Sequence, residues 1–412
     1  MRLLLMTLYV IFTVAPLYVY IYNLWIILAG RRHRKEPYDA LSEKENRFCI
    51  IICARNEERV IAQLINSLHE QEYPKDKLDI YVIADNCTDS TAQIAKEKNA
   101  HVMVRNDTSH IGKGYALSYF FQNINPSDYD AFCIFDADNL VDKRFIRIMN
   151  SRINSGEKII QGGRRAANPG ESPTSSCYAL YFDFITKIYF KARMNRGMAC
   201  TVSGTGFAFT SDLVANGWST SSITEDAEFS IQNLLHGVKV TLAENAVFYD
   251  EQPASFMQSI PQRRRRSAGT MQLLKKYGKK LAQLASDETA PSMLRKSAMD
   301  YILFMLMVPT NAMPIISGFL GTLLLFMIVP DLSKVFLWMG ISCAASYILN
   351  VIFAYIVLIA TKDSFAKMWK GLLFYPIFCF SWSIISFTAC INNKCKWKPI
   401  EHKGKKGFVL DE

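Results

Sequence analysis

Eight residues, Ala131-Phe-Cys-Ile-Phe-Asp-Ala-Asp138, join a short apolar run to two carboxylates. The run is too short for a helix and is typical of a buried strand. Side chains two positions apart on a strand point to the same side, so Asp136 and Asp138 would project together from the carboxyl end, where open α/β sheets bind ligands. Such a pair suits Mg²⁺ or Mn²⁺ that also binds phosphate oxygens. The alternative is a strand followed by a solvated acidic turn.

The composition indicates a membrane protein with a large polar insert. The chain has 412 residues, is 50% hydrophobic and carries a formal net charge of +10, and its length favours two or three structural units. Leu3 to Gly30 has no charged side chain, and long uncharged stretches recur after Tyr301. Each is long enough to cross a bilayer, which takes about 20 apolar residues. No basic array with interleaved aromatic residues indicates nucleic acid.

The charges after the first apolar segment predict its orientation. Arg31-Arg-His-Arg-Lys35 follows the segment directly, so the positive-inside rule places the insert in the cytoplasm and the N-terminus outside, as in a multi-pass plasma-membrane protein. The segment is longer than the apolar part of a signal peptide, and we expect a retained anchor. None of the ten cysteines forms a Cys-x-x-Cys pair, which indicates reduced packing residues.

The insert alternates between strand and helix patterns. Continuous apolar runs are typical of buried parallel strands, and strands that alternate with short helices indicate βαβ units around a parallel sheet. The expected strands are Phe48–Ala54, Ile80–Ala84 and His101–Val104, with helices from Val60 to Leu68 and around Ile94 and Ala95. The strand that ends in Asp136 continues this α/β series.

Two glycine-containing segments receive different interpretations. We interpret Gly162-Gly163 as a tight turn, but Ser203-Gly-Thr-Gly206 as a loop where the backbone approaches a ligand. A second acidic group, Ile223-Thr-Glu-Asp-Ala-Glu228, follows that loop. Thr224 is expected to cap a helix there, with Glu225 and Asp226 at its positive end. The alternative is that this group supplies a catalytic carboxylate.

A run of arginines precedes the C-terminal apolar region. Pro261-Gln-Arg-Arg-Arg-Arg266 is either a lipid-facing basic patch or a grip on a diphosphate, because the planar guanidinium makes paired bonds to phosphate oxygens. The stretch from Ser267 to Leu284 would be an amphipathic helix in the membrane interface.

In the C-terminal region, the number of apparent spans conflicts with the charge of the tail. We expect spans near 301–329, 335–360 and 371–391, and Pro309, Asn311 and Pro314 divide the first into an interfacial helix and a true span. Three crossings would leave the tail outside, yet its basic composition favours the inside. One apparent span would therefore be re-entrant or interfacial, and the segment around Pro376 is the candidate.

Taken together, these pieces resemble the membrane-integrated family 2 glycosyltransferases, the group of cellulose, hyaluronan, chitin and poly-N-acetylglucosamine synthases. The resemblance covers roughly Phe48 to Tyr277 and the arrangement of apolar segments. The matching pieces are Ala54-Arg-Asn-Glu-Glu58, Ala84-Asp-Asn-Cys-Thr-Asp89, Gly112-Lys-Gly-Tyr-Ala-Leu117, Asp136-Ala-Asp138, Ser203-Gly-Thr-Gly206, Thr224-Glu-Asp226 and Gln262-Arg-Arg-Arg-Arg266.

The resemblance implies a GT-A fold, a Rossmann-like α/β cytoplasmic domain between N-terminal and C-terminal transmembrane helices. It implies that the donor is a UDP-sugar. The positions that match donor contacts are Ala54 in the first motif, Glu57 and Asp85 for uracil and ribose, Lys113 for the nucleotide, and Asp136 facing the nucleotide. Asp138 would bind the metal, Mg²⁺ or Mn²⁺.

The resemblance also implies roles on the acceptor side. Asp226, in the Thr224-Glu225-Asp226 motif, would be the general base, and Gly204, Thr205 and Gly206 would form the floor under the acceptor. Gln262 and Arg265 match the Gln-x-x-Arg-Trp motif that closes over diphosphate and acceptor. Arg266 stands where the family carries Trp, so the placement of the acceptor differs. Trp397 resembles a C-terminal tryptophan motif of some members.

The expected division of the chain follows from these motifs. It comprises an anchor (1–30), a basic linker (31–47), the glycosyltransferase domain (48–260), the arginine motif with an interfacial helix region (261–298), transmembrane or interfacial helices (299–392) and a basic tail (393–412).

The expected function is processive, inverting transfer from a UDP-sugar into a β-linked polysaccharide, a glucan or an N-acetylglucosamine polymer, that leaves through a channel formed by the spans. The alternative is a non-processive enzyme that glycosylates a membrane lipid, because ceramide glucosyltransferases share most of these motifs. A silent scaffold or transporter is a third possibility, against which Asp136, Asp138 and Asp226 argue. Sugar identity, linkage, partner subunits and oligomeric state have no signal in the sequence.

Overall fold

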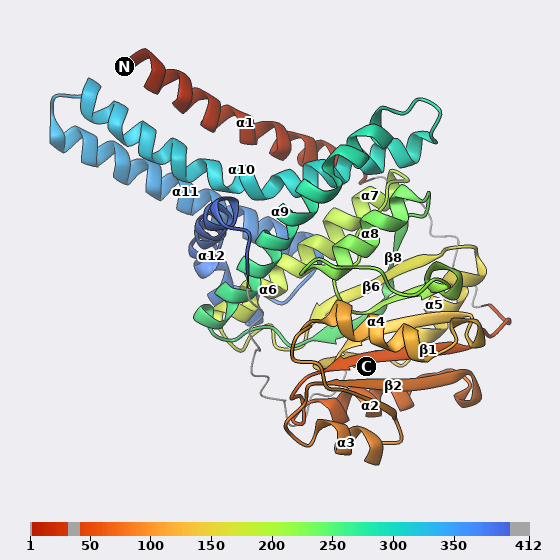
Figure 1. Ribbon diagram of the computed structural model, residues 1–412. Coiled ribbons are helices and arrows are strands. Elements are labelled where there is room, and N and C mark those ends of the chain that lie inside the picture. Colours follow the sequence, from red (N-terminus) through yellow and green to blue (C-terminus); the bar gives the residue numbers. More distant parts are fainter. Residues whose placement is uncertain (1, 32–41, 396–412) are drawn as a thin grey trace.

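The computed structural model of the protein describes residues 2–31 and 42–395. An α/β domain lies beside a group of long helices (Figure 1). The α-helices and strands, in chain order, are α1 (Arg2–Ala29), β1 (Phe48–Ala54), α2 (Ile61–His69), β2 (Leu78–Asp85), α3 (Thr91–Glu97), β3 (His101–Arg105), α4 (Lys113–Asn123), β4 (Ala131–Asp136), β5 (Asn139–Val141), α5 (Phe145–Asn154), β6 (Ile159–Ala166), α6 (Pro173–Asp183), α7 (Lys191–Asn195), β7 (Phe207–Thr210), α8 (Glu225–Leu235), β8 (Val240–Asp250), α9 (Phe256–Ser286), α10 (Ser292–Ile328), α11 (Leu332–Thr361) and α12 (Phe365–Ile391). A π-helical segment, η3 (Phe184–Phe190), joins α6 to α7, and short 3-10 turns are η1 (Lys75–Lys77), η2 (Pro126–Asp128) and η4 (Ser211–Val214).

The eight strands form one mixed sheet in the order β3-β2-β1-β4-β7-β6-β8-β5. The first four strands are parallel, as the sequence predicts. Because Ala54 pairs with Ala84 and Cys53 with Asp136, these three strands end at the same edge of the sheet. The α/β prediction is confirmed, and the carboxyl ends of β1, β2 and β4 define where a ligand site can form.

Alternate residues of β1 face opposite sides of the sheet. Phe48, Ile50 and Ile52 pack with α2, α3 and α5. Cys49 and Ile51 pack with α4, η3 and α8 on the other face. Both faces are covered, which explains why β1 is a continuous apolar run instead of an alternating one.

One local prediction is wrong. Gly162 and Gly163 lie inside β6, at a shift of register against β8, and not in a turn. A Cβ atom on Gly163 would collide with the backbone of Glu244, so the glycines allow two strands to approach at a bulge. The first C-terminal apolar segment is one continuous helix, α10, with Pro309 and Pro314 inside it, so an interfacial part and a true span would belong to the same helix.

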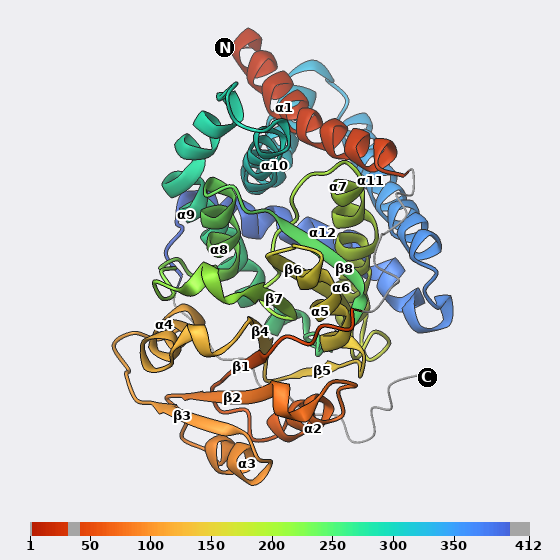
Figure 2. The ribbon, with the colours of Figure 1, turned by 90° about the vertical axis from the view of Figure 1, so that its right-hand side faces the viewer.

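Within residues 2–31 and 42–395, four helices are long and apolar enough to cross a membrane: α1, α10, α11 and α12. In Figure 1, α1, α10 and α11 extend from the domain in broadly the same direction, whereas α12 is seen end-on; in Figure 2, α12 runs across the view and α10 is seen end-on. In the most apolar stretch of α12, 39% of the residues are buried, against 17% in α10 and α11. The reason is that α12 packs on α6 and α9 as well as on α10 and α11.

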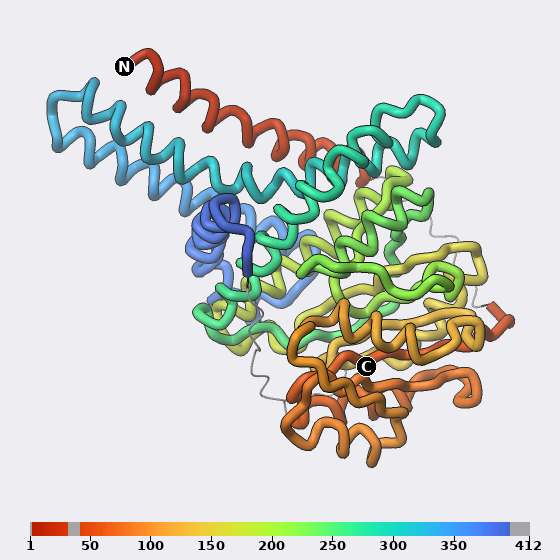
Figure 3. Tube along the Cα trace, in the orientation of Figure 1, coloured from red at the N-terminus to blue at the C-terminus, as the bar shows by residue number. Residues whose placement is uncertain are grey.

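Helix α9 links the α/β domain to the apolar helices. Figure 3 traces it from the edge of the domain to the turn before α10. It passes through Pro261 and begins at Phe256, before the expected interfacial helix.

A buried ion pair between α7 and α10 also binds the first helix, α1. The Arg193 Nε of α7 lies 2.8 Å from Asp300 Oδ2 of α10, and Arg193 also donates a 2.7 Å hydrogen bond to Asn23 of α1. Three parts of the chain therefore meet at one charged pair. Residues 32–35 of the predicted basic run, Trp397 and the tail from residue 396 lie outside the described residues.

Candidate active site

The site is built around the contact between Lys113 and Asp136. Lys113, the first residue of α4, forms an ion pair with the Asp136 carboxylate and donates a 2.8 Å hydrogen bond to the Gly204 carbonyl. The backbone N–H of Asp136 donates to Thr205 Oγ1 at 2.9 Å. Burial opposes the charge on Lys113, but Asp136 and then Cys53 outweigh this effect and raise the pKa of Lys113. The ends of β4 and α4 and the 203–206 loop thus form one unit around a stable cation.

The second acidic group lies beside this unit. Burial first, and then the neighbouring Asp226, raise the pKa of Glu225 to about 7, while Lys113 and Arg265 act in the opposite direction. The Asp226 carboxylate lies against the 203–206 loop: an ideal Cβ on Gly204 would be 3.4 Å from Asp226 Oδ2. The backbone at Gly204 has φ +90°, which glycine adopts readily. The loop therefore passes close beside Asp226.

Thr224 does not cap α8 in the predicted way. It stands at the N-cap position, but its side chain makes no capping hydrogen bond, and its Oγ1 atom is buried without a partner among the described residues. Its side chain instead packs against Gly269 of α9. The start of α8 is thus positioned by contact with α9.

The arginine motif faces the acidic group from α9. Gln262, Arg265 and Arg266 share one side of the helix, since they lie three and four positions apart. Arg265 interacts electrostatically with Glu225, and Arg266 with Asp226. Arg266 also donates a 3.2 Å hydrogen bond to the Tyr181 hydroxyl of α6. The structure brings the Thr-Glu-Asp and arginine motifs together, although 36 positions separate Asp226 from Gln262.

Asp138 lies at the acidic end of the site. Loss of water, together with Asp250 and Asp136, raises the pKa of Asp138 well above its usual value. Arg164 acts in the opposite direction and favours the ionised form, and a divalent cation would add further positive charge. In the part of the chain that the structure describes, no group of three or more His, Cys, Asp or Glu side chains is arranged to hold a metal. Asp138 suits an ion that takes most of its ligands from substrate phosphates and water, as Mg²⁺ usually does.

The remaining predicted donor residues lie at the neighbouring strand ends. Ala54 is the last residue of β1 and is buried. The backbone N–H of Glu57 donates a 2.8 Å hydrogen bond to Thr91. The carboxylate of Asp85 is buried and lies 2.6 Å from the Arg105 guanidinium. Asp85 thus has a structural partner, which the sequence did not reveal.

Arg164 is a site residue that the sequence reasoning missed. It forms an ion pair with Asp250, donates a 3.1 Å hydrogen bond to the Ser203 carbonyl and lies 3.9 Å from the centre of the Phe182 ring. The available signal was the sequence Gly162-Gly-Arg-Arg165, because basic residues near the end of a strand can reach the same edge of the sheet as Asp136.

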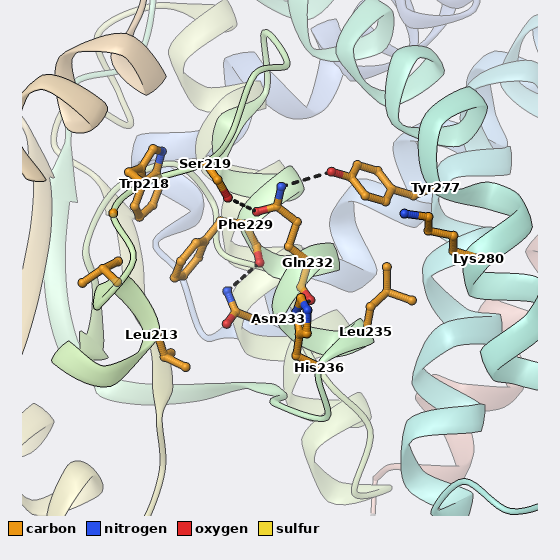
Figure 4. A pocket seen from close by; sticks show the side chains of 12 residues that line it. Leu213, Trp218, Ser219, Phe229, Gln232, Asn233, Leu235, His236, Tyr277 and Lys280 are labelled. Carbon is orange, nitrogen blue, oxygen red and sulfur yellow. Dashed lines mark hydrogen bonds between the residues drawn. The ribbon is translucent and has the colours of Figure 1, made fainter. Parts of the chain in front are cut away.

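A separate hollow of about 420 Å³ lies beside α8 and α9 (Figure 4). The figure shows Gln232 joined by hydrogen bonds to Tyr277 and Ser219. The lining residues come from the second half of α8, from the 213–219 segment and from α9, and no predicted site residue is among them. The site described above is thus a different place on the domain.

The fold has a counterpart among solved structures. The chain superposes with a TM-score of 0.62 on the mannosyltransferase PcManGT from Pyrobaculum calidifontis in complex with GDP-Man and Mn2+, covering 92% of this chain and 99% of that one at 16% identity. This likeness defines the class: a GT-A-like α/β domain flanked by N-terminal and C-terminal long apolar helices.

Residues 46–270, more than half of the chain, match the family described as Glycosyltransferase like family 2, and the chain belongs to that family. It is 26% identical over 278 residues to the Probable glycosyltransferase YdaM of Bacillus subtilis (strain 168), covering 62% of this chain and 64% of the relative. It is 27% identical over 288 residues to the Beta-monoglucosyldiacylglycerol synthase of Synechocystis sp. (strain ATCC 27184 / PCC 6803 / Kazusa), covering 67% of this chain and 58% of the relative. The chain thus spans less than two thirds of the length of both relatives.

Proposed function

We propose that this protein transfers one sugar from a nucleotide sugar, with UDP-sugar as the first candidate, to a hydroxyl group of a membrane lipid. The observation that carries the proposal is a chain of neighbours from Asp226 to an apolar helix. Asp226 interacts with Arg266, Arg266 donates to Tyr181, and the Tyr181 ring stacks on Trp382 of α12 at 6.1 Å. An acceptor that approached along α12 would meet the carboxylate without leaving the membrane surface.

The proposed chemistry is a single inverting displacement. Asp226 is the general base that accepts the proton of the attacking hydroxyl, and such a base contributes about 10²- to 10⁴-fold. Asp226 lies close to Gly204, and the small residues of the 203–206 loop would let an acceptor sugar approach the backbone next to this base. Attack from the face opposite the leaving diphosphate converts an α-linked donor into a β-linked product.

The donor would lie on the other side of the base. Lys113 and Arg265 place positive charge near Glu225, where a diphosphate gains negative charge as its bond to the sugar breaks. We assign Gln262 to the same closing motif and Ala54, Glu57, Asp85 and Asp136 to the nucleotide side. Mg²⁺ or Mn²⁺ held by Asp138 would neutralise charge on the diphosphate.

We prefer lipid glycosylation to the polymer synthesis that we expected from the sequence. The name of the Synechocystis relative gives a glycosylated diacylglycerol as its product. In addition, Arg266 replaces the Trp of the polysaccharide synthases, beside the base. These two observations support the non-processive alternative, and we do not carry the export channel forward.

We also propose that α1, α10 and α11 cross the bilayer and that α12 lies along its cytoplasmic surface. The support is the packing of α12 between the α/β domain and the other apolar helices. A second observation supports this proposal: α12 runs across the direction of α10 and α11 in Figures 1 and 2. This arrangement removes the conflict between the number of spans and the charge of the tail, because two C-terminal crossings return the basic tail to the cytoplasm.

Product analysis tests the proposal. The purified protein is incubated with Mn²⁺ or Mg²⁺, lipid vesicles and a panel of UDP-glucose, UDP-N-acetylglucosamine and GDP-mannose, and products are analysed by mass spectrometry. We expect a lipid that carries one β-linked sugar. A glycanase-sensitive polymer without any glycolipid would refute the proposal and restore polysaccharide synthesis.

A further inference from the structure

Among the described residues, neither Arg263 nor Arg266 forms a close ion pair, although the Asp226 carboxylate acts on Arg266 electrostatically. The side chain of Arg263 is buried, with 2% exposure. Its guanidinium donates hydrogen bonds only to neutral acceptors among the described residues: Ser381 Oγ at 2.6 Å, Ser259 Oγ at 3.0 Å and the Phe378 carbonyl at 3.3 Å. Arg266, three positions on, donates to the Tyr181 hydroxyl. Arg263 thus bonds to α12 and Arg266 lies near Asp226, and neither forms an ion pair in the described part of the chain.

Buried polar atoms without partners gather on the same three helices. In the described residues, Arg263 Nε, Tyr178 Oη, Ser267 Oγ and Ser386 Oγ are buried and make no hydrogen bond. They belong to α9, α6 and α12, which pack against one another. Unsatisfied buried polar atoms are rare and costly in native proteins. Neighbouring aromatic rings offset only part of the cost of burying the Arg263 charge. The centre of the nearest ring, that of Phe378, lies 4.4 Å from the guanidinium carbon.

The surroundings indicate what would complete this place. A phosphate or carboxylate has several acceptor oxygens, and a guanidinium binds such a group through paired hydrogen bonds. The position between Asp226 and the Tyr181–Trp382 stack is on the acceptor side of the base, whereas Lys113 and Arg265 lie near Glu225. An anion bound there would belong to the acceptor.

We infer that the acceptor carries a phosphate or carboxylate next to its reactive hydroxyl and that Arg266 binds this anion, with Arg263 adding positive charge behind it. The inference rests on the proposed function and defines its substrate class. Arg266 then determines specificity, and a neutral acceptor with the same hydroxyl leaves its guanidinium without a partner.

The test compares two acceptors in phosphatidylcholine vesicles: dioleoylphosphatidylglycerol, with hydroxyls beside a phosphate, and dioleoylglycerol, with a hydroxyl and no charge. We expect the wild type to have a KM roughly tenfold lower for the phosphatidylglycerol, from the strength of a charge-assisted contact. Arg266→Gln should remove this difference, and Arg266→Lys should retain part of it. In Arg266→Gln, the KM for the donor should change much less than the KM for phosphatidylglycerol.

Arg264→Gln is the matched control. It removes the same charge from the same helix, but residue 264 lies about 200° around the helix from residue 266. It should keep the preference for phosphatidylglycerol, which separates recognition by Arg266 from general attraction of a basic protein to an anionic membrane. Thermal unfolding of each variant shows that the fold is intact.

Three results would overturn parts of the inference. If Arg266→Gln keeps the preference for phosphatidylglycerol, or raises the donor KM instead, Arg266 does not bind an acceptor anion. If soluble glycerol 3-phosphate is used with the same dependence on Arg266, the anion site stands but the lipid acceptor does not. If a neutral lipid is glycosylated as well as the anionic one, the proposed function survives and the anion site fails.

Discussion

Thr224 and Gly269 are in such close contact that a methyl group on Gly269 would overlap the Thr224 side chain. Thr224 directly precedes the carboxylates of α8, and Gly269 lies one turn beyond Arg265 and Arg266 on α9. The distance between the acidic and the arginine motifs is therefore fixed by the absence of a side chain at residue 269.

Gly269→Ala should push α9 away from the start of α8. Thr224 is β-branched and stiff, so we expect a loss of about 1–3 kcal/mol in the free energy of unfolding. We also expect kcat to fall between about 10- and 100-fold, because small displacements of positioning groups are costly. Gly278→Ala is the control on the same helix, where the added methyl group would meet only Leu274 Cδ1 at 3.4 Å. Equal activity of the two variants would show that this contact does not position the site.

Asp226→Asn should lower the transfer rate by about 10²- to 10⁴-fold while UDP-sugar affinity stays within about twofold, because an amide cannot accept the proton. Affinity is measured by calorimetry and transfer by release of UDP in the presence of acceptor. Asp212→Asn removes an exposed carboxylate paired with Lys158 and should leave both unchanged. An Asp226→Asn enzyme with full transfer would remove Asp226 from the role of base.

Glu225 should make stability depend on pH. Its pKa is raised from 4.5 to about 7 in the folded protein, so between these values the folded state binds more protons than the unfolded state. The free energy of unfolding then falls as pH rises through this window and stays lower above it. Glu225→Gln should flatten this fall when thermal unfolding is followed between about pH 5 and 8. Parallel curves for the variant and the wild type would contradict the raised pKa.

Asp138→Asn should weaken metal binding. We expect the Mn²⁺ concentration for half-maximal donor binding to rise at least about tenfold, with removal of metal by EDTA having little further effect on the variant. Asp142→Asn is the control. Asp142 lies just after β5, and its carboxylate accepts a hydrogen bond from the backbone N–H of Arg144. Unchanged Mn²⁺ dependence in Asp138→Asn would place the ion elsewhere.

The proposed orientation of α12 predicts which residues are accessible from each side. In a background with Cys343 and Cys390 replaced by Ser, a membrane-impermeant maleimide should label Ser333→Cys, at the start of α11, only from outside intact cells. Cys395, after α12, should be labelled only once the membrane is permeabilised. Labelling of both from outside would mean that α12 crosses the bilayer.

The parallel half of the sheet could be predicted from the sequence because its strands are apolar on both faces and end in polar residues. The family motifs assign Lys113 and Asp136 to the nucleotide side, but the contact between them appears only in the fold. The orientation of α12 could be stated only as a candidate, since a helix that lies on a membrane between protein layers has the same apolar composition as one that crosses it.

Other features depend on contacts that no local pattern contains. The fit of Thr224 on Gly269 joins residues 45 positions apart, and Thr224 alone matches an ordinary capping residue. The glycines of β6 indicate a turn unless the approach of the β8 backbone is known. Arg164 lies 86 positions from Asp250, and Arg105 lies 20 positions from Asp85. These two pairings therefore become visible only in the fold.

If α12 lies on the bilayer as proposed, the active site stays at a fixed height above it. The enzyme would then sample acceptors in two dimensions, and its rate would follow the mole fraction of acceptor in one leaflet, not the acceptor concentration in the whole volume. Adding inert lipid at constant acceptor would slow the reaction by surface dilution, and the composition of the host membrane would set how fast the enzyme works.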